Sequence, residues 1–169
     1  MSAPGPARRA EVTRDDWETP QELFDLLDTD FGGFDLDGAA NDKNHKCPLW
    51  LGPGGLVGNA FEWEPNDHVP MSIWCNPPYG KALGDWMAMF RAWARSGHTV
   101  VALVPNSTDC LWFRAAAQDA LEVRLLTGRV QFVGTTSSNP SGSAIFVFAP
   151  GLLTAQPDGA VIRMWDWKR

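Results

Sequence analysis

The 169-residue sequence predicts an α/β fold with an abbreviated, mostly parallel sheet. Two apolar segments carry this prediction, because residues 73–75 and the β-branched run at 99–104 each end at or just before a proline. Between them, residues 81–96 place apolar side chains at helical spacing, and a glycine follows as a C-cap. Strand, helix and strand in this order predict a βαβ unit whose two strands end at the same edge of the sheet.

The first part of the chain predicts a tail, a helix and a short strand. Residues 1–13 lack periodicity and predict a flexible tail, so that residues 14–169 are expected to form a single domain. Thr19 is predicted to cap a helix whose first residue is Pro20. Residues 34–37 alternate in polarity and predict a strand that ends at Asp37. The small residues Gly38, Ala39 and Ala40 follow it, in a turn where a ligand can approach the backbone.

The second half predicts further elements beyond the βαβ unit. We expect a helix at residues 109–117, strands at 122–126, 129–133 and 144–148, and an edge strand at 161–165. The strands at 129–133 and 144–148 are predicted to form a C-terminal antiparallel hairpin. Their polar connection, residues 134–143, is long enough to be functional.

Composition limits the class of protein. The net charge of −6 argues against a general nucleic-acid coat protein, but it allows an enzyme with a local basic cleft. No apolar run is long enough to span a membrane and no signal peptide is visible, so a cytoplasmic protein is expected. The three cysteines are odd in number and far apart, which suits a reducing compartment. His45-x-Cys47 is too small a cluster to predict a metal site, and none is expected.

Asn76-Pro77-Pro78-Tyr79 is the stretch with the clearest chemical meaning. The prolines fix the backbone, so the Asn76 side-chain oxygen and the Pro77 carbonyl become two stiff acceptors beside the aromatic ring of Tyr79. Such a pair can accept both hydrogens of a conjugated amino group and direct the nitrogen lone pair at an electrophilic methyl. The alternative without chemistry is a Pro-Pro turn after a strand. Adenine N6, cytosine N4, RNA adenine and a glutamine amide all present the required planar amino group.

Taken in order, the motifs resemble the phage-type DNA N6-adenine methyltransferase family. The resemblance runs from about residue 17 to residue 148, and it is carried by the following segments: Trp17-x-Thr19-Pro20, Phe34 to Ala40, Gly55-Leu56 with Trp63, Trp74 to Tyr79, Val101 to Pro105, Asp109 with Trp112-Phe113, and Gly128 to Phe132. It implies a compact Rossmann-like, class I methyltransferase that depends on S-adenosylmethionine (AdoMet). It further implies that Trp17, Thr19, Pro20 and the turn from Asp37 to Ala40 contact AdoMet. Asn76 to Tyr79 would hold an adenine flipped out of double-stranded DNA.

The sequence departs from the family in one motif and leaves some properties open. Where an acid usually precedes Gly-Leu, this chain has Pro53-Gly54-Gly55-Leu56, so Glu62, Glu64 and Asp67 are unassigned candidates for holding the adenosine. No separate target-recognition domain is expected, and residues 41–58 and 134–143 are the candidate recognition loops. A non-catalytic DNA-binding protein on a methyltransferase core is the alternative from another class. The target sequence, the oligomeric state and the role in genome protection, restriction-modification or regulation stay open.

Overall fold

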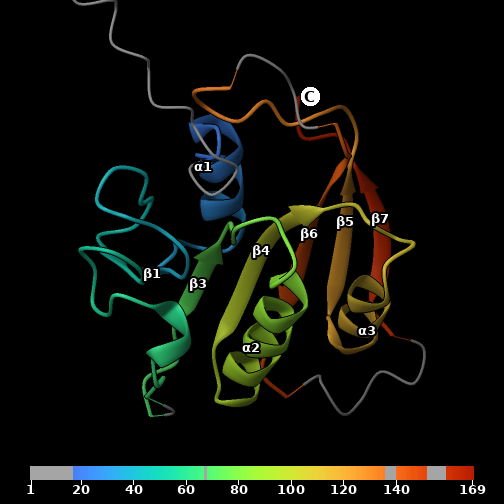
Figure 1. Cartoon of the computed structure of the whole chain (residues 1–169). Helices are drawn as coiled ribbons and strands as arrows, with labels where there is room; N and C mark the ends of the chain where they lie inside the picture. Colours follow the sequence, from blue (N-terminus) through green and yellow to red (C-terminus); the bar gives the residue numbers. More distant parts are fainter. Residues whose placement is uncertain (1–16, 67, 136–139, 152–158) are drawn as a thin grey trace, which may run out of the picture.

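The computed structural model describes residues 17–66, 68–135, 140–151 and 159–169, so the predicted tail at residues 1–13 lies outside the described residues. The described residues form one sheet with α-helices packed on it (Figure 1). The helices are α1 (Gln21–Asp30), α2 (Leu83–Arg95), α3 (Leu111–Asp119) and the 3-10 helix η2 (Ala60–Glu62). The strands are β1 (Leu36–Asp37), β2 (Leu49–Trp50), β3 (Ser72–Cys75), β4 (Thr99–Pro105), β5 (Glu122–Leu126), β6 (Ser143–Phe148) and β7 (Val161–Trp165).

The strand order across the sheet is β2-β1-β3-β4-β6-β5-β7. Strand β6 is antiparallel to both of its neighbours, and every other neighbouring pair of the described strands is parallel. The predicted α/β class and the mostly parallel sheet are therefore confirmed. So are the strand at residues 161–165, which forms the edge strand β7, and the parallel pairing of β3 with β4.

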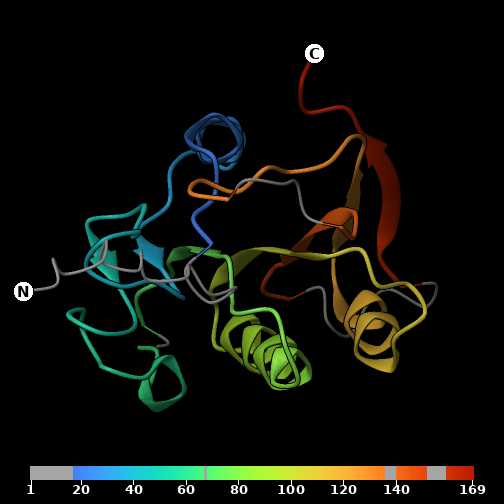
Figure 2. The same cartoon turned by 45° about the horizontal axis from the view of Figure 1, so that its top comes forward.

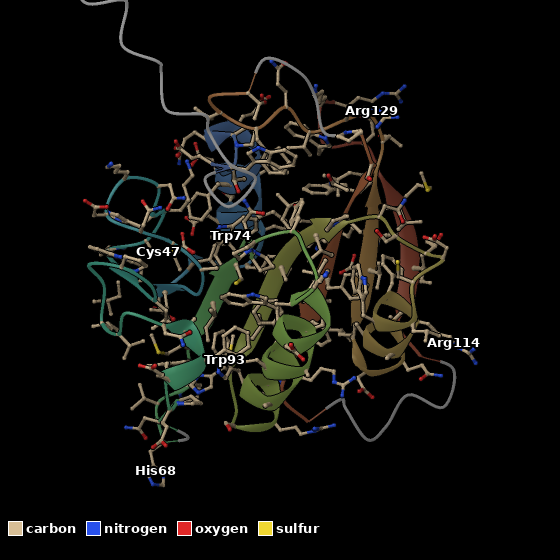
Figure 3. The ribbon with its side chains drawn as sticks, in the orientation of Figure 1. Cys47, His68, Trp74, Trp93, Arg114 and Arg129 are labelled. Atoms are coloured by element: carbon tan, nitrogen blue, oxygen red, sulfur yellow. The ribbon has the colours of Figure 1, made fainter. Side chains whose placement is uncertain are left out.

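The helices lie on both faces of the sheet. Figure 2 shows α1 on one side and α2 with α3 on the other. The central strand β4 therefore buries side chains in both directions: Val101 and Leu103 pack on the α1 side, and Ala102 packs on the α2 side. Trp74, near α1, and Trp93, on α2, belong to these two separate core clusters (Figure 3). A continuous apolar strand is the pattern expected where both faces of a sheet are covered.

The predicted start of the first helix is wrong by one position. The helix begins at Gln21, and Pro20 rather than Thr19 occupies the N-cap position, where its carbonyl accepts the amide of Leu23 at 3.1 Å. No side-chain cap hydrogen bond forms at this end. Thr19 is instead only 2% exposed, because the segment before the helix packs against the rest of the protein. The Thr-Pro pattern therefore marks a buried threonine before the helix and not an N-cap.

The predicted hairpin between residues 129–133 and 144–148 is wrong. Residues 129–133 form no strand, and β6 instead lies between β4 and β5, which occupy both of its edges. The alternation that predicted a strand is real, since Val130 and Phe132 are buried. The backbone of Val133, however, forms an isolated antiparallel bridge with Glu18. The antiparallel pair near the C-terminus is β5 with β6.

A helix that crosses a membrane has to be both long and apolar. None of the helices in the described ranges combines the length and apolar character needed to cross a membrane. The helix predicted at residues 109–117 is present but begins two residues later, at Leu111, with Cys110 as its N-cap.

Candidate functional site

The carboxyl ends of β1 and β3 lie side by side, because the two strands are parallel neighbours with Asp37 opposite Trp74. The chain leaves β1 towards β2 on one side and returns to β3 on the other, which makes this point the switch in strand order. Open α/β sheets bind ligands in the crevice at such a switch, beyond the strand ends. A cavity of about 350 Å³ lies there. It is lined by Trp17, Glu18, Thr19, Asp37, Ala39, Ala40, Asn41, Asn44, Lys46, Leu51, Gly52, Pro53, Gly58, Asn59, Ala60, Trp74, Asn76, Pro78 and Trp86.

The cavity brings together most of the residues singled out from the sequence. Of the predicted cofactor residues, those that line it are Trp17, Thr19, Asp37, Ala39 and Ala40. Of the predicted catalytic residues, those that line it are Asn76 and Pro78. Pro20, Gly38, Pro77 and Tyr79 are not among the lining residues. The two predicted groups, more than 30 residues apart in the sequence, therefore share one site.

Asp37 is a buried acid in the wall of this cavity, with 2% of its surface exposed. Its Oδ1 accepts the backbone amide of Ala39 at 3.2 Å, and its Oδ2 accepts that of Lys46 at 2.9 Å. Burial raises the pKa of the Asp37 carboxyl from 3.8 to about 6, and the two backbone hydrogen bonds oppose part of this rise. A cationic group in the cavity would favour the ionised form, so this wall suits a positively charged ligand.

Glycines allow the turn after β1 to pack tightly. A Cβ on Gly38 would lie 3.1 Å from Trp93 and 3.3 Å from Cys75. Gly52 has φ +129° and a Cβ there would lie 2.0 Å from the carbonyl oxygen of Ala40. Gly38 is therefore needed for packing beneath the turn, and its predicted contact with a ligand stays a prediction.

Lys46 and Glu18 form an ion pair in the same wall. The Lys46 ammonium lies 2.8 Å from Glu18 Oε1, and the lysine side chain is only 6% exposed. The Lys46 ammonium also donates to Gln21 Oε1 at 3.0 Å. The pair thus joins the loop after β1 to the segment that enters α1.

Asn76 has one half of its amide bound and the other half free of a partner. Its Nδ2 donates to the carbonyl of Trp17 at 2.9 Å. Its Oδ1 is buried and has no hydrogen-bond partner among the described residues. An unpaired buried acceptor costs about 1–3 kcal/mol, which a donor arriving from the cavity would recover. The oxygen predicted to accept an amino hydrogen is therefore the unsatisfied one.

Tyr79 lies in an aromatic cluster with Trp17 and Phe132. Its ring meets Trp17 edge-on at 5.9 Å and Phe132 edge-on at 5.9 Å, and its hydroxyl donates to the carbonyl of Leu103 at 3.4 Å. Burial, and to a smaller extent Cys75, raise the pKa of the Tyr79 hydroxyl, so the phenol stays neutral. In this arrangement the ring packs against protein side chains rather than facing the cavity.

Sequence reasoning missed several polar residues of the cavity: Glu18, Asn41, Asn44, Lys46 and Asn59. The acids proposed for the adenosine, Glu62 and Glu64, do not line the cavity, and Asp67 lies outside the described residues. Asn59 did have a signal in the sequence, because an Asn three residues before Glu62 is a pattern typical of a helix cap. In the structure its side chain accepts the Phe61 amide at 3.1 Å and caps η2.

The described residues contain no group of three or more His, Cys, Asp or Glu side chains able to hold a metal ion. In the short motif His45-x-Cys47, the imidazole Nδ1 is hydrogen-bonded to the carbonyl of Cys47 at 2.9 Å. The imidazole ring stacks on Trp50, with ring centroids 4.0 Å apart. His45 thus has a structural role in the loop after β1.

Comparison with known proteins identifies the family of this chain. A family model for the DNA N-6-adenine-methyltransferase (Dam) family matches residues 7–154. A DNA N-6-adenine-methyltransferase of Escherichia phage T1 is 26% identical over 159 residues, with 81% of this chain and 63% of that relative covered. The chain thus spans less than two thirds of the length of the relative. Because the family match covers most of the sequence, the chain belongs to the DNA N-6-adenine-methyltransferase (Dam) family.

Proposed function

We propose that this chain transfers a methyl group from AdoMet to N6 of an adenine in DNA. The observation that carries the proposal is the unpaired, buried Oδ1 of Asn76, held beside a cavity at the switch point of the sheet. An exocyclic amino group supplies the donor that this oxygen lacks. Family membership and the similarity to the phage relative support this activity and this base.

The cavity fits AdoMet as the cofactor. Its volume of about 350 Å³ falls within the roughly 300–1,000 Å³ of small-molecule sites. The carboxyl group of Asp37 suits a cationic ligand, while Leu51 and Trp86 provide an apolar wall. When bound, AdoMet supplies a methyl group on a positively charged sulfur. The strand order supports a Rossmann-like methyltransferase core of class I.

The protein's part in the reaction is to position the amino group. The Asn76 side-chain oxygen accepts one hydrogen of the amino group, and the Pro77 carbonyl accepts the other. The nitrogen is thereby biased towards tetrahedral geometry, with its lone pair available for attack. These acceptors stabilise the positive charge that develops on nitrogen in the transition state. No general base is required before methyl transfer, because the excess proton leaves afterwards.

The adenine has to leave the DNA duplex to reach the oxygens of Asn76 and Pro77. Asn76 Oδ1 is buried and Tyr79 packs within an aromatic cluster, so the adenine needs side chains around this corner to move before it can stack on Tyr79. We assign recognition of the DNA sequence to loops, residues 41–58 and 134–143, in one catalytic domain that acts in the cytoplasm. Of the second loop, residues 136–139 lie outside the described residues.

Product analysis tests the proposal. The protein is incubated with methyl-labelled AdoMet and unmethylated DNA, and the DNA is digested to nucleosides. We expect the label in N6-methyladenine. Label in N4-methylcytosine, or no label while a phage methyltransferase control is active, would refute the assignment. Parallel reactions with RNA and with protein test the other planar amino groups, and AdoMet calorimetry tests the non-catalytic alternative, which predicts no binding.

A further inference from the structure

We propose that the backbone carbonyl of Trp17 is a positioning group for catalysis, which makes Asn76 present its oxygen to the target amino group, and that Phe132 holds this carbonyl in place. The inference rests on the proposed function, because it concerns how the amino group is bound. It assigns to Trp17 a role distinct from the cofactor contact expected from the sequence.

The first step concerns the orientation of the Asn76 amide. A carbonyl oxygen can only accept, so the half of the amide that lies 2.9 Å from the Trp17 carbonyl has to be the NH₂ group. The opposite orientation would place two oxygens, which can only accept, against each other. The Trp17 carbonyl therefore selects the amide orientation, and Oδ1 is left as the unpaired atom.

The second step concerns what a reversed amide would do to the reaction. An amino group that is to be methylated offers two hydrogens and requires acceptors. A reversed Asn76 would present its own hydrogens to those hydrogens, which removes an acceptor and adds repulsion. The amide orientation should therefore change the turnover number and leave cofactor affinity unaffected.

The third step concerns how Trp17 is held. Its indole ring stacks on Phe132 with centroids 5.0 Å apart and planes 22° apart. The backbone carbonyl of the next residue, Glu18, accepts the backbone amide of Val133 at 2.9 Å. Figures 1 and 2 both show the orange segment after β5 returning beside the start of α1, and Arg129 near its beginning is labelled in Figure 3. Residues 132–133 thus fix both the ring and the main chain at this point.

The decisive variant is Asn76→Asp, which is similar in size but lacks the NH₂ donor. When protonated, the introduced carboxyl can donate to the Trp17 carbonyl and still present an oxygen to the amino group. When ionised, it places a negative oxygen against that carbonyl. The ratio of the variant's kcat to that of the wild type should therefore be highest at low pH and fall about tenfold per pH unit above the pKa of the introduced acid.

Comparing the kcat of Asn76→Asp with that of the wild type as a ratio controls for other titratable groups near the Asn76 amide. Glu18, Asp37 and Lys46 line the same cavity in both proteins, so their effects on kcat cancel in the ratio. Burial raises the pKa of Cys75 and of Tyr79, so these two neighbours stay neutral. A ratio that is flat, or that rises with pH because the carboxylate is the better acceptor, would overturn the inference.

A second measurement does not depend on activity. In the wild type we expect the side-chain amide resonance of Asn76, identified by its loss in Asn76→Asp, to show a hydrogen-bonded proton protected from exchange. In Phe132→Leu this protection should fall, with kcat lowered roughly tenfold and AdoMet affinity within twofold of wild type. The matched control is Phe148→Leu, which removes another fully buried phenylalanine from the opposite core cluster. It should leave both the resonance and kcat unchanged.

The outcomes separate the two proposals. An unprotected Asn76 amide in the wild type, or equal losses of kcat in the two Phe→Leu variants, would refute the role of Trp17 and Phe132. A protected amide, lost in Phe132→Leu, together with no methylation of adenine by the wild type, would refute the proposed substrate and leave the positioning contact established.

Discussion

The two ends of the sheet treat buried charge differently. At the β5–β7 end, Glu122 is 8% exposed and is paired with two arginines, Arg124 at 2.8 Å and Arg163 at 2.6 Å. At the β1–β3 end, Asp37 is 2% exposed, and its carboxylate oxygens accept backbone amides of the loop that follows. The first acid is neutralised by the fold itself. The second lies against a cavity, where an arriving cation can complete its environment.

A similar contrast holds between two hydrogen-bonding side chains, Arg124 and Asn76. Arg124 combines its ion pairs with packing over the rings of Phe31 and Trp165, at 5.3 and 5.2 Å. Asn76, at the other end, leaves its oxygen buried and unpaired. An unsatisfied buried acceptor costs stability, and this one belongs to a residue that lines the cavity, so it indicates where a ligand is expected. Loss of the Asn76 acceptor should therefore mainly change the chemistry, and loss of the Arg124 guanidinium should mainly change stability.

The largest effect is expected for Asn76→Ala. It removes one preorganised acceptor, which should cost about 2.7–4 kcal/mol of transition-state stabilisation, or roughly 10²–10³ in kcat. Single-turnover kinetics measure the rate, and calorimetry should show that AdoMet binding is retained. Near-normal turnover would contradict the role of Asn76 and remove the distinction between the two ends.

Arg124→Ala should mainly lower stability. Loss of the guanidinium leaves Asp30 without the ion pair at 2.5 Å and leaves Glu122 with one arginine instead of two. We expect the free energy of unfolding to fall by about 2–3 kcal/mol, measured by urea titration, with AdoMet affinity unchanged. Arg169→Ala is the control, because this side chain is 86% exposed and its loss should have no measurable effect. An unchanged urea midpoint for Arg124→Ala would show that the network does not stabilise this end.

Gly38→Ala tests the packing beneath the site. The added methyl would lie 3.1 Å from Trp93 and 3.3 Å from Ile73, and such overpacking costs about 1–3 kcal/mol. Gly84→Ala in α2 is the matched control, because its Cβ would make an ordinary contact of 3.5 Å with Trp112. A helix gains up to about 1 kcal/mol from this exchange. Thermal unfolding should therefore move in opposite directions for the two variants, and a shared direction would contradict this account of Gly38.

The smallest effect is the pH dependence of AdoMet binding. The pKa of Asp37 is raised to about 6, and a bound cation favours its ionised form, so the dissociation constant should be constant above pH 6. Below pH 6 the affinity should fall, by at most about tenfold per pH unit. Calorimetry across this range measures it, and Asp37→Asn should remove the dependence. An affinity that rises as the pH falls would contradict contact between Asp37 and a cation.

The same carboxyl also affects folding. Its pKa is about 6 in the folded protein against 3.8 for the ordinary group, so the folded state holds a proton in this window that the unfolded chain has lost. Its contribution to stability is therefore largest below pH 3.8 and declines as the pH rises to about 6. This is the opposite of the usual behaviour of a salt-bridged acid.

Much of the fold was predictable from local pattern. Helix α2 and strand β4 follow from apolar spacing and from the breakers that end them, and the prediction that β1 ends at Asp37 is also confirmed. The segment at residues 129–133 was not predictable, because its alternation is that of a strand while its backbone pairs with Glu18. Alternating burial shows which side chains face the core, but it does not identify the partner of the backbone.

The sequence alone determined most of the helices and strands and the stiff Asn76-Pro77-Pro78-Tyr79 corner, because backbone sterics and side-chain periodicity act between near neighbours. Only the tertiary structure decided that Asn76 binds the Trp17 carbonyl, a contact between residues 59 apart in the chain. It also decided that Lys46 and Asn59 enter the cavity. Contacts over such separations depend on how the packed elements are placed in space, which no local pattern specifies.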